Sequence, residues 1–290
     1  MSNLQLFATC VAIWGSTWIA IKFQLGRVAP EASVFWRFLI ASAVVFAFCW
    51  ARKLPLRYTR REHLWFAILG AFMFCLSYIF VYYAEEHVVS GLVAVGYSAS
   101  PLLGMLGMRL FFGTAITPRI TAGALLGMMG IALVFGSEFA KLGSDRDTML
   151  GATYTAIAVV LSTLGSMVAQ RNSARGIPLW QGMAWGMLYG AICALAITVV
   201  SGKAVDFEPT APYALSLLYL SLMGSVAAFA GYLTLLHRIG AARSGYIGVM
   251  VPIVALLISA AFEKFSFHPL LWVGVAISVV GNVVILRNRE

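Results

Sequence analysis

The residues of this chain that could bind a ligand are mostly aromatic and hydroxyl side chains inside long apolar stretches. Trp14 and Trp18 are four residues apart, so a helix would present both on one face. Similar side chains occur in later apolar stretches: Tyr78, Tyr82, Tyr97, Tyr232 and Ser244. A buried tyrosine hydroxyl needs a hydrogen-bonding partner, while its ring offers a large apolar surface. We therefore predict that these seven residues line an amphipathic cavity for a small zwitterion with an apolar side chain.

Ionisable residues inside the apolar stretches are few, and each is costly there unless it is paired or hydrated. Arg37 could anchor a carboxylate, although snorkelling or a bond to a backbone carbonyl would also explain it. Glu85 and Glu86 end one apolar stretch, which predicts a solvated helix end. Glu263 stands beside Lys264 and predicts a structural pair at another helix end.

Catalytic and metal-binding patterns are not recognisable in the sequence. The four cysteines form no C-x-x-C motif, and no two of the four histidines are spaced four residues apart. The apolar stretches also contain no H-E-x-x-H motif and no pair of aspartates that would suit hydrolysis. We therefore expect no enzymatic activity, no cofactor and no metal site.

The composition indicates that these residues lie in a membrane. Hydrophobic residues make up 61% of the chain and charged residues 11%, whereas soluble domains carry roughly 25% charged residues. Apolar stretches of about 20 residues, each long enough to span a bilayer, recur at 3–22, 32–51, 63–84, 89–111, 119–136, 149–170, 179–200, 212–236, 243–262 and 269–286. We predict an all-α integral membrane protein with ten transmembrane helices, the first of which is retained rather than cleaved as a signal.

The charged residues divide between the two sides of this predicted bundle. Ten spans place both termini on one side, together with thirteen of the basic residues; six basic residues lie on the other side. Acidic residues show the reverse, with two on the first side and nine on the second. The excess of basic residues predicts cytoplasmic termini. The net charge of +9 is thus explained without nucleic acid, and the basic 52–61 loop is either solvated or in contact with lipid headgroups.

The sequence also repeats itself. At an offset of 151 residues, Pro101 matches Pro252, Gly123 matches Gly274 and Gly130 matches Gly281. At an offset of 150, Gly15-Ser16 matches Gly165-Ser166 and Gly26 matches Gly176. We predict two units, residues 1–145 and 146–290. Because each holds five spans, the second must be inverted relative to the first, an arrangement typical of transporters with a site between the halves. Pro101 and Pro252 are predicted hinges, although proline also kinks helices for packing alone.

The repeated pattern resembles the EamA domain of the drug/metabolite transporter superfamily. That pattern has a proline, a half-helix ending near a glutamate and a Gly-x6-Gly helix. The second unit matches it through Pro252, Phe262-Glu263, Gly274 and Gly281, whereas Phe112 replaces the glutamate in the first. Trp14-Gly15-Ser16, Pro30 and Arg37-Phe38 are also similar to that family. The small multidrug antiporters of the superfamily carry a carboxylate in helix one, and CVAIWGSTWIAIK here has none.

Within the superfamily the chain most resembles the YddG-type amino-acid exporters. This resemblance implies ten helices and efflux of aromatic and other neutral amino acids or similar small metabolites. The expected protein is an alternating-access secondary transporter of the cell inner membrane, a monomer or homodimer whose partners are its substrate and the lipid bilayer. The same fold carries sugars, nucleotide sugars, purines and drugs. A multidrug or nucleoside/sugar exporter, a channel-like facilitator and a non-transporting assembly partner therefore remain open.

Overall fold

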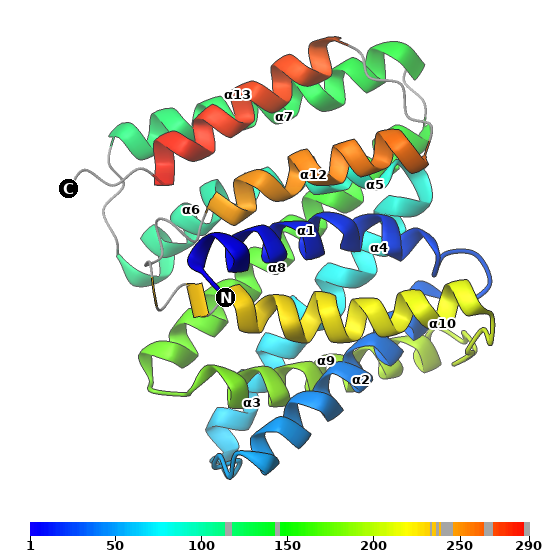
Figure 1. The fold of residues 1–290 in the computed structure, drawn as a ribbon, viewed down its shortest axis with the longest axis vertical. Coiled ribbons are helices and arrows are strands. Elements are labelled where there is room, and N and C mark those ends of the chain that lie inside the picture. Colours follow the sequence, from blue (N-terminus) through cyan, green and yellow to red (C-terminus); the bar gives the residue numbers. More distant parts are fainter. Residues whose placement is uncertain are drawn as a thin grey trace.

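The computed structural model describes residues 1–113, 118–142, 146–232, 234–235, 238, 246–263 and 269–286. Within these residues every regular element is a helix, and the helices form a bundle of long rods that run in similar directions (Figure 1). This confirms the prediction of an all-α fold.

Several rods consist of consecutive helical segments with different geometry. The elements of the first half are α1 (Asn3–Lys22), α2 (Pro30–Ala51), α3 (Arg60–Leu69), η1 (Gly70–Leu76), α4 (Ser77–His87), α5 (Ser90–Gly96), η2 (Tyr97–Ala99), α6 (Ser100–Phe112) and α7 (Pro118–Leu142). Those of the second half are α8 (Arg146–Ala174), α9 (Leu179–Val200), α10 (Ala211–Leu218), η3 (Tyr219–Ala227), α12 (Tyr246–Phe262) and α13 (Pro269–Leu286). η1 and η3 are π-helical and η2 is a 3₁₀ turn, and each continues the rod on either side of it.

Seven of these rods are long and apolar enough to cross a membrane. They are Asn3–Lys22, Pro30–Ala51, Arg60–His87, Ser90–Phe111, Arg146–Ala174, Leu179–Val200 and Ala211–Tyr232. The other three predicted spans coincide with shorter apolar helices at Thr121–Val134, Ile247–Phe262 and Pro269–Gly281. The structure therefore supports a multi-pass membrane protein, and the count of ten spans stays a prediction.

Local sequence signals explain where several rods begin and end. Ser2 and Thr59 cap α1 and α3, each in a reciprocal capping box with the residue three positions later, Gln5 or Glu62. Gly26 and Gly176 have φ angles of +121° and +77°, a conformation that side-chain-bearing residues rarely adopt. These two glycines are matched in the sequence repeat, and each lies in the connection that follows the first helix of its predicted unit.

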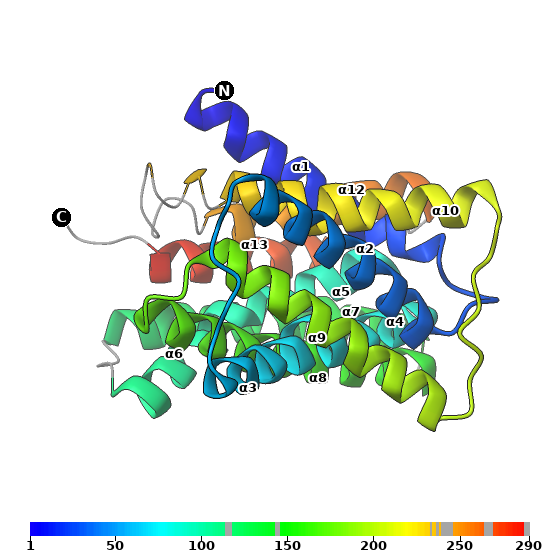
Figure 2. The ribbon, with the colours of Figure 1, turned by 90° about the horizontal axis from the view of Figure 1, so that it is seen from below.

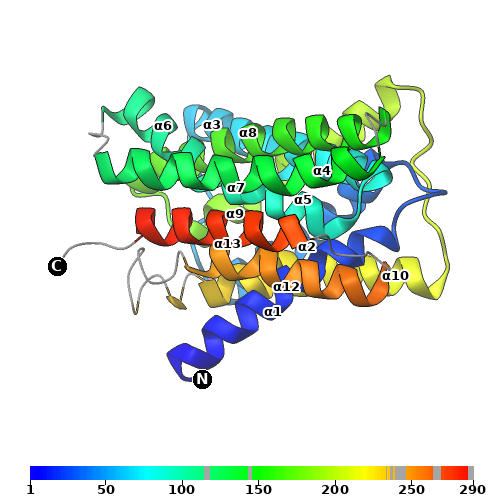
Figure 3. The same ribbon diagram turned by 90° about the horizontal axis from the view of Figure 1, so that it is seen from above.

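The helices α7 and α13 pack with their backbones in contact, and they lie side by side in two views (Figures 1 and 3). A Cβ added to Gly130 would lie 2.5 Å from the carbonyl oxygen of Gly274, and one added to Gly281 would lie 2.5 Å from that of Gly123. The later glycine of α7, Gly130, meets the earlier glycine of α13, Gly274, and Gly123 meets Gly281. The two helices are therefore antiparallel. Small residues allow this close approach of helices in a membrane.

The two ends of the bundle differ in charge. The basic end carries the start of α1, the 52–59 loop and the start of α3; the acidic end carries Lys22, Glu85, Ser90 and Glu263. Between them lies an apolar core built mainly on α2, η1, α4 and α9. The start of α1 projects away from the other helices at the basic end (Figure 2).

Candidate functional site

The predicted aromatic residues form two ring contacts along α1. The ring centroid of Trp18 lies 5.2 Å from that of Tyr97 in η2. Trp14 lies 5.6 Å from Tyr232 and 5.4 Å from Phe229. All five side chains are half-buried. Helix α1 therefore brings together aromatic residues from both predicted units. All of them except Phe229 belong to the predicted binding set.

Tyr78 connects these aromatic contacts to a buried charge. It is the second residue of α4, just after η1, and its ring lies 4.8 Å from that of Phe38. The guanidinium carbon of Arg37 lies 4.4 Å from the centre of the Tyr78 ring. Tyr78 and Tyr97 pack against the same apolar cluster. The predicted residues Trp18, Tyr97 and Tyr78 thus lead from α1 to Arg37.

Tyr82 lies one turn further along α4 and reaches Arg37 from a different direction. It is fully buried, and its hydroxyl donates a hydrogen bond to Oε1 of Gln24. The same hydroxyl neighbours the Arg37 guanidinium. Tyr82 therefore contributes a polar neighbour to this arginine instead of an open aromatic face. The remaining predicted residue, Ser244, lies outside the described residues.

Arg37 is itself buried, with 2% of its surface exposed. Its Nε donates to the hydroxyl of Ser225 at 3.3 Å, while its Nη1 has no hydrogen-bond partner. The ion pairs of the described residues join other side chains and leave this guanidinium without a carboxylate. The burial contradicts the snorkelling alternative, because the charged group does not reach water.

Two π-helical segments border this arginine. The ring of Phe74 in η1 lies 5.3 Å from that of Phe38, the residue after Arg37 in α2, and Ser225 belongs to η3. The hydroxyl of Ser225 donates to the carbonyl of Leu220 five residues earlier at 2.9 Å. η1 and η3 begin 149 residues apart, at similar places in the two predicted units. Because π segments are rare and are frequent at functional sites, they mark this part of the bundle.

Helix α1 holds η3 through two further hydrogen bonds. The indole nitrogen of Trp14 donates to the carbonyl of Gly224 at 3.1 Å, and the hydroxyls of Ser16 and Tyr219 lie 2.7 Å apart. Thr17 packs where a side chain on Gly224 would stand. The sequence could not predict these contacts, because no residue type specifies a π segment.

The acidic end is closed by a polar network around Glu263. The carboxylate of Glu263 accepts hydrogen bonds from the backbone nitrogen of Ser90 at 3.1 and 3.2 Å and from its hydroxyl at 2.6 Å. Lys22 lies 3.6 Å from Glu263 and donates to the carbonyls of Glu85 and Val88. The network therefore joins α1, α4, α5 and α12. The expected partner of Glu263, Lys264, lies outside the described residues.

The two neighbouring glutamates at the end of α4 differ in their surroundings. Glu86 is exposed, as predicted for a solvated helix end, whereas Glu85 is fully buried and neither carboxyl oxygen has a hydrogen-bond partner. The prediction was thus wrong for Glu85, which is buried at the end of α4 where Lys22 of α1 donates to the carbonyls of Glu85 and Val88.

A second connection at this end joins the loop before α10 to α2 and α4. The ammonium of Lys203 donates to the carboxylate of Glu31 at 2.8 Å, and the hydroxyl of Tyr83 also donates to Glu31. The hydrogen bond to Glu31 raises the pKa of Lys203 above its usual value. Glu31 is 2% exposed, so the loop lysine neutralises an otherwise buried charge.

The predicted hinges lie in helices that differ in continuity. Pro101 is the second residue of α6, directly after the 3₁₀ turn η2 that interrupts this rod, whereas Pro252 lies inside the continuous helix α12. On the two sides of η2 the packing changes. α5 packs against α1 and α12, whereas α6 packs chiefly against α8.

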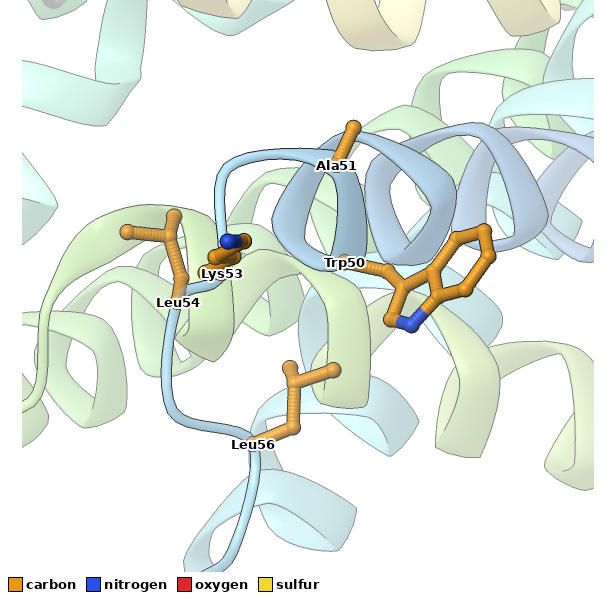
Figure 4. A pocket seen from close by; sticks show the side chains of 5 residues that line it. All are labelled: Trp50, Ala51, Lys53, Leu54 and Leu56. Carbon is orange, nitrogen blue, oxygen red and sulfur yellow. The ribbon is translucent and has the colours of Figure 1, made fainter.

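A surface pocket of about 470 Å³ lies apart from these residues. It is lined by Trp50, Ala51, Lys53, Leu54 and Leu56, at the end of α2 and in the loop that follows (Figure 4). It contains one ionisable side chain and faces the basic end, so it does not belong to the arrangement around Arg37. Across the described part of the chain, no three His, Cys, Asp or Glu side chains are grouped as metal ligands would be.

Comparison with known proteins identifies the family. Residues 1–136 and 149–287 match the model of the EamA-like transporter family, and together they cover almost the whole chain. The chain belongs to the EamA-like transporter family. The two matched segments lie one within each predicted unit, although the boundary between the EamA units stays a prediction.

Similar proteins are mostly transporters named without a substrate. The uncharacterized inner membrane transporter YedA of Escherichia coli (strain K12) is 26% identical over 290 residues, which cover 98% of this chain and 90% of YedA. The uncharacterized transporter YoaV of Bacillus subtilis (strain 168) is 23% identical over 245 residues, which cover 84% of this chain and 82% of YoaV. PagO of Salmonella typhimurium is 27% identical over 106 residues, 37% of this chain and 35% of PagO.

One solved structure has the same overall arrangement as this EamA chain. It superposes with a TM-score of 0.70 at 20% identity and covers 98% of this chain and 96% of the other. At this identity the likeness shows the fold alone. Family membership, the apolar rods and the transporter relatives together establish a multi-pass membrane transporter.

Proposed function

We propose that this protein exports amino acids, aromatic and other neutral ones, or similar small metabolites by alternating access. The observation that carries the proposal is the pairing of Trp18 with Tyr97 and of Trp14 with Tyr232 along α1. These half-buried rings offer apolar surface to a substrate, and charged groups are scarce among them. Such a lining suits a zwitterion whose side chain is apolar.

The mechanism we propose uses two inverted five-helix units, ten helices in all. The antiparallel contact of α7 and α13 supports this symmetry. The contact of Gly130 with Gly274 becomes that of Gly281 with Gly123 when each residue is exchanged for its repeat partner. A two-fold relation between inverted units would produce this exchange. Opening at either end then corresponds to exchanging the conformations of the two units.

We propose that both termini lie in the cytoplasm of a cell whose inner membrane holds the protein. The charge distribution supports this orientation, and YedA is named as an inner membrane transporter. The acidic end would then face outward and is closed in this structure by Glu263 and Lys22. Reporter fusions after Arg57 and Glu290 should both read cytoplasmic, and a periplasmic signal at Glu290 would contradict the orientation.

The transport proposal is tested by reconstituting the purified protein in liposomes. Labelled amino acids, nucleosides, sugars and cationic dyes are loaded on one side, and flux is followed with and without the unlabelled compound on the other side. We expect saturable flux of large neutral amino acids that speeds up when unlabelled amino acid is present on the far side. This acceleration is the mark of an alternating-access carrier.

Other outcomes separate the alternatives. If dyes, nucleosides or sugars are transported and amino acids are not, the proposed substrate class is wrong and the carrier mechanism still holds. Flux that neither saturates nor responds to unlabelled compound would indicate a channel-like facilitator. A folded protein that moves no compound in any class would indicate an assembly partner, and the export proposal would fail.

A further inference from the structure

Arg37 is a buried cation that forms no ion pair with any carboxylate of the described residues. Its direct neighbours are the hydroxyls of Ser225 and Tyr82 and the ring of Tyr78, while the buried carboxylate of Glu85 acts on it only from a distance. A guanidinium has five N–H donors, and its Nη1 has no acceptor here. A charged group in this position is expensive and usually serves a function.

The unsatisfied donors of Arg37 define the chemistry of a missing partner. A planar guanidinium forms two parallel hydrogen bonds with a carboxylate, a geometry that a lysine cannot reproduce. Ser225 occupies Nε and so fixes the guanidinium plane, while Nη1 stays available. The site therefore suits an anion with an acceptor oxygen directed at Nη1, and a carboxylate meets this requirement.

The position of Arg37 relates this anion site to the aromatic residues. Tyr78 contacts the guanidinium with its ring and packs against the same apolar cluster as Tyr97, whose ring meets that of Trp18 edge-on. A molecule with a carboxylate at one end and an apolar group at the other could bind along this row. We propose that Arg37 binds the carboxylate of the transported substrate, an inference that rests on the proposed function and narrows its cargo to carboxylate-bearing molecules.

The site is covered in the present conformation, and its borders are the parts able to move. The side chain is 2% exposed beneath Tyr78, and the flanking segments η1 and η3 are π-helical. Each backbone hydrogen bond of a π segment spans one residue more than in an α-helix, so moving the segment along the rod rotates the side chains beyond it. Such a shift beside Tyr78 would expose Nη1 to an incoming carboxylate.

The first test compares ligands on the unmodified protein in liposomes. Four compounds share one phenyl side chain: phenylalanine, phenylalaninamide, phenethylamine and 3-phenylpropionate. A site that hydrogen-bonds a group discriminates strongly against analogues that lack it, so phenylalanine should be transported at least about tenfold faster than its amide and the amine. 3-Phenylpropionate retains the carboxylate and should compete with phenylalanine, whereas the amide should not. The neutral analogue 3-phenylpropanamide has no positive charge and no carboxylate, so its failure to compete would separate carboxylate recognition from a preference for lower positive charge.

The second test changes the arginine. Arg37→Gln should bring the ratio of acid to amide transport close to one. Arg37→Lys keeps the charge but loses the paired geometry, so it should retain part of the ratio. Ser225→Ala keeps the arginine and should lower the ratio, because Nε loses the acceptor that orients it. Arg171→Gln is the matched control, since Arg171 also lies over a ring, that of Trp65 at 4.0 Å, but away from this site; its ratio should equal that of the wild type.

The outcomes distinguish this inference from the transport proposal. Equal flux of phenylalanine and phenylalaninamide through the wild type, or an unchanged ratio in folded Arg37→Gln, would overturn the carboxylate site while leaving amino-acid transport intact. Transport confined to nucleosides or cationic dyes would overturn both the carboxylate site and the amino-acid cargo. The wild-type ligand comparison needs no variant, so a folding defect in Arg37→Gln does not prevent the test.

Discussion

Glu31, Glu263 and Arg37 are charged side chains in the interior, and each is satisfied differently. Glu31 takes an ammonium from Lys203, and Glu263 accepts backbone and hydroxyl donors from Ser90. Both have the strong hydrogen bonds that offset burial of a charge. Arg37 donates from Nε to the hydroxyl of Ser225 and lies against aromatic rings, and its Nη1 has no partner. Glu31 also has one oxygen, Oε2, without a partner, so what sets Arg37 apart from Glu31 and Glu263 is that it lacks an ion pair with an opposite charge.

The contact between Trp18 and Tyr97 predicts coupled effects on transport. Trp18→Ala and Tyr97→Ala should each lower the transport of large neutral amino acids, because each removes one wall of the same aromatic contact. The double variant should be little worse than either single one, since residues in contact do not act independently. The measurement is initial flux in liposomes, normalised to the amount of protein reconstituted.

Trp50→Ala is the control for this pair, because Trp50 is 81% exposed and lies at the basic end. It should leave flux unchanged. The same scan extends to Trp14, Tyr78, Tyr82 and Tyr232. Unchanged transport at all six aromatic positions would place the substrate cavity elsewhere.

The Lys203–Glu31 pair predicts a stability difference that depends on pH. Lys203→Met leaves Glu31 without its ammonium and should lower the apparent Tm. The effect should correspond to about 1 kcal/mol or less, because Lys203 is partly exposed and water screens the pair. The folded-state pKa of Lys203 is raised above its usual 10.5. The wild-type advantage should therefore be complete at neutral pH and disappear only as the pH rises through that raised value.

Thermal unfolding in detergent, at neutral pH and in steps above pH 10.5, would measure this difference. Lys53→Met is the control, since Lys53 is an exposed lysine in the loop after α2. A variant as stable as the wild type at pH 7 would mean that the connection contributes nothing to folding.

The sequence predicted the aromatic side of this site better than its charged side. Helical spacing and apolar context placed Trp18, Tyr97 and Tyr78 in one region, and ring contacts join Trp18 to Tyr97. The burial of Glu85 could not be predicted, because its position at a helix end beside the exposed Glu86 gives no sign of a lysine from α1 above it. Partners that come from distant parts of the chain are invisible to local patterns.

At the level of elements, the close contact of α7 and α13 depends on glycines at particular positions. Gly130→Ala would place its methyl group 2.5 Å from the carbonyl oxygen of Gly274. The helices would have to separate, and we expect a loss of about 1–3 kcal/mol, the usual cost of overfilling a packed interface. The measurement is the apparent Tm of the purified variant.

Gly127→Ala is a matched control in the same helix. A Cβ at Gly127 would meet no heavy atom within 4 Å, and alanine favours a helix by about 1 kcal/mol over glycine. This variant should be as stable as the wild type or more so. Equal loss of stability in the two variants would show that helix propensity or folding in general, and not this contact, sets the effect.

The sequence located most elements but not their internal geometry. Runs of apolar residues marked each rod, and the matched Gly26 and Gly176 both adopt positive φ angles. The π segments η1 and η3 and the 3₁₀ turn η2 were not predicted, since the residues in them are ordinary helix formers. In the structure Gly70 of η1 packs against α9, and Ser225 of η3 accepts a hydrogen bond from Arg37.

On the scale of the whole molecule, the packing of α5 and α6 is consistent with a conformation closed at the acidic end. α5 packs against α1 and α12 beside the Glu263 network, while beyond η2 the chain packs chiefly against α8. If the two units are inverted copies, exchanging their conformations would break the contacts of α5 and join α6 to α12. The difference between α5 and α6 then represents one of the two states of transport.

Pro101 and Pro252 should bias these two states in opposite directions. Pro101→Ala restores a backbone donor next to η2 and favours a straight helix, which would bring α6 toward α12 and close the basic end. Pro252→Ala straightens the equivalent helix of the inverted unit and should close the acidic end instead. A bias of about 1.4 kcal/mol would change the ratio of states roughly tenfold.

Labelling of single cysteines measures this bias, after Cys10, Cys49, Cys75 and Cys193 have been replaced. Leu106→Cys on α6 reports the basic end, where Leu106 is 48% exposed, and Val89→Cys before α5 reports the acidic end. Pro101→Ala should lower labelling at position 106 and raise it at 89, and Pro252→Ala should do the reverse. Identical labelling in the two variants would show that the prolines only shape packing, because a hinge in each inverted unit must act on opposite ends of the molecule.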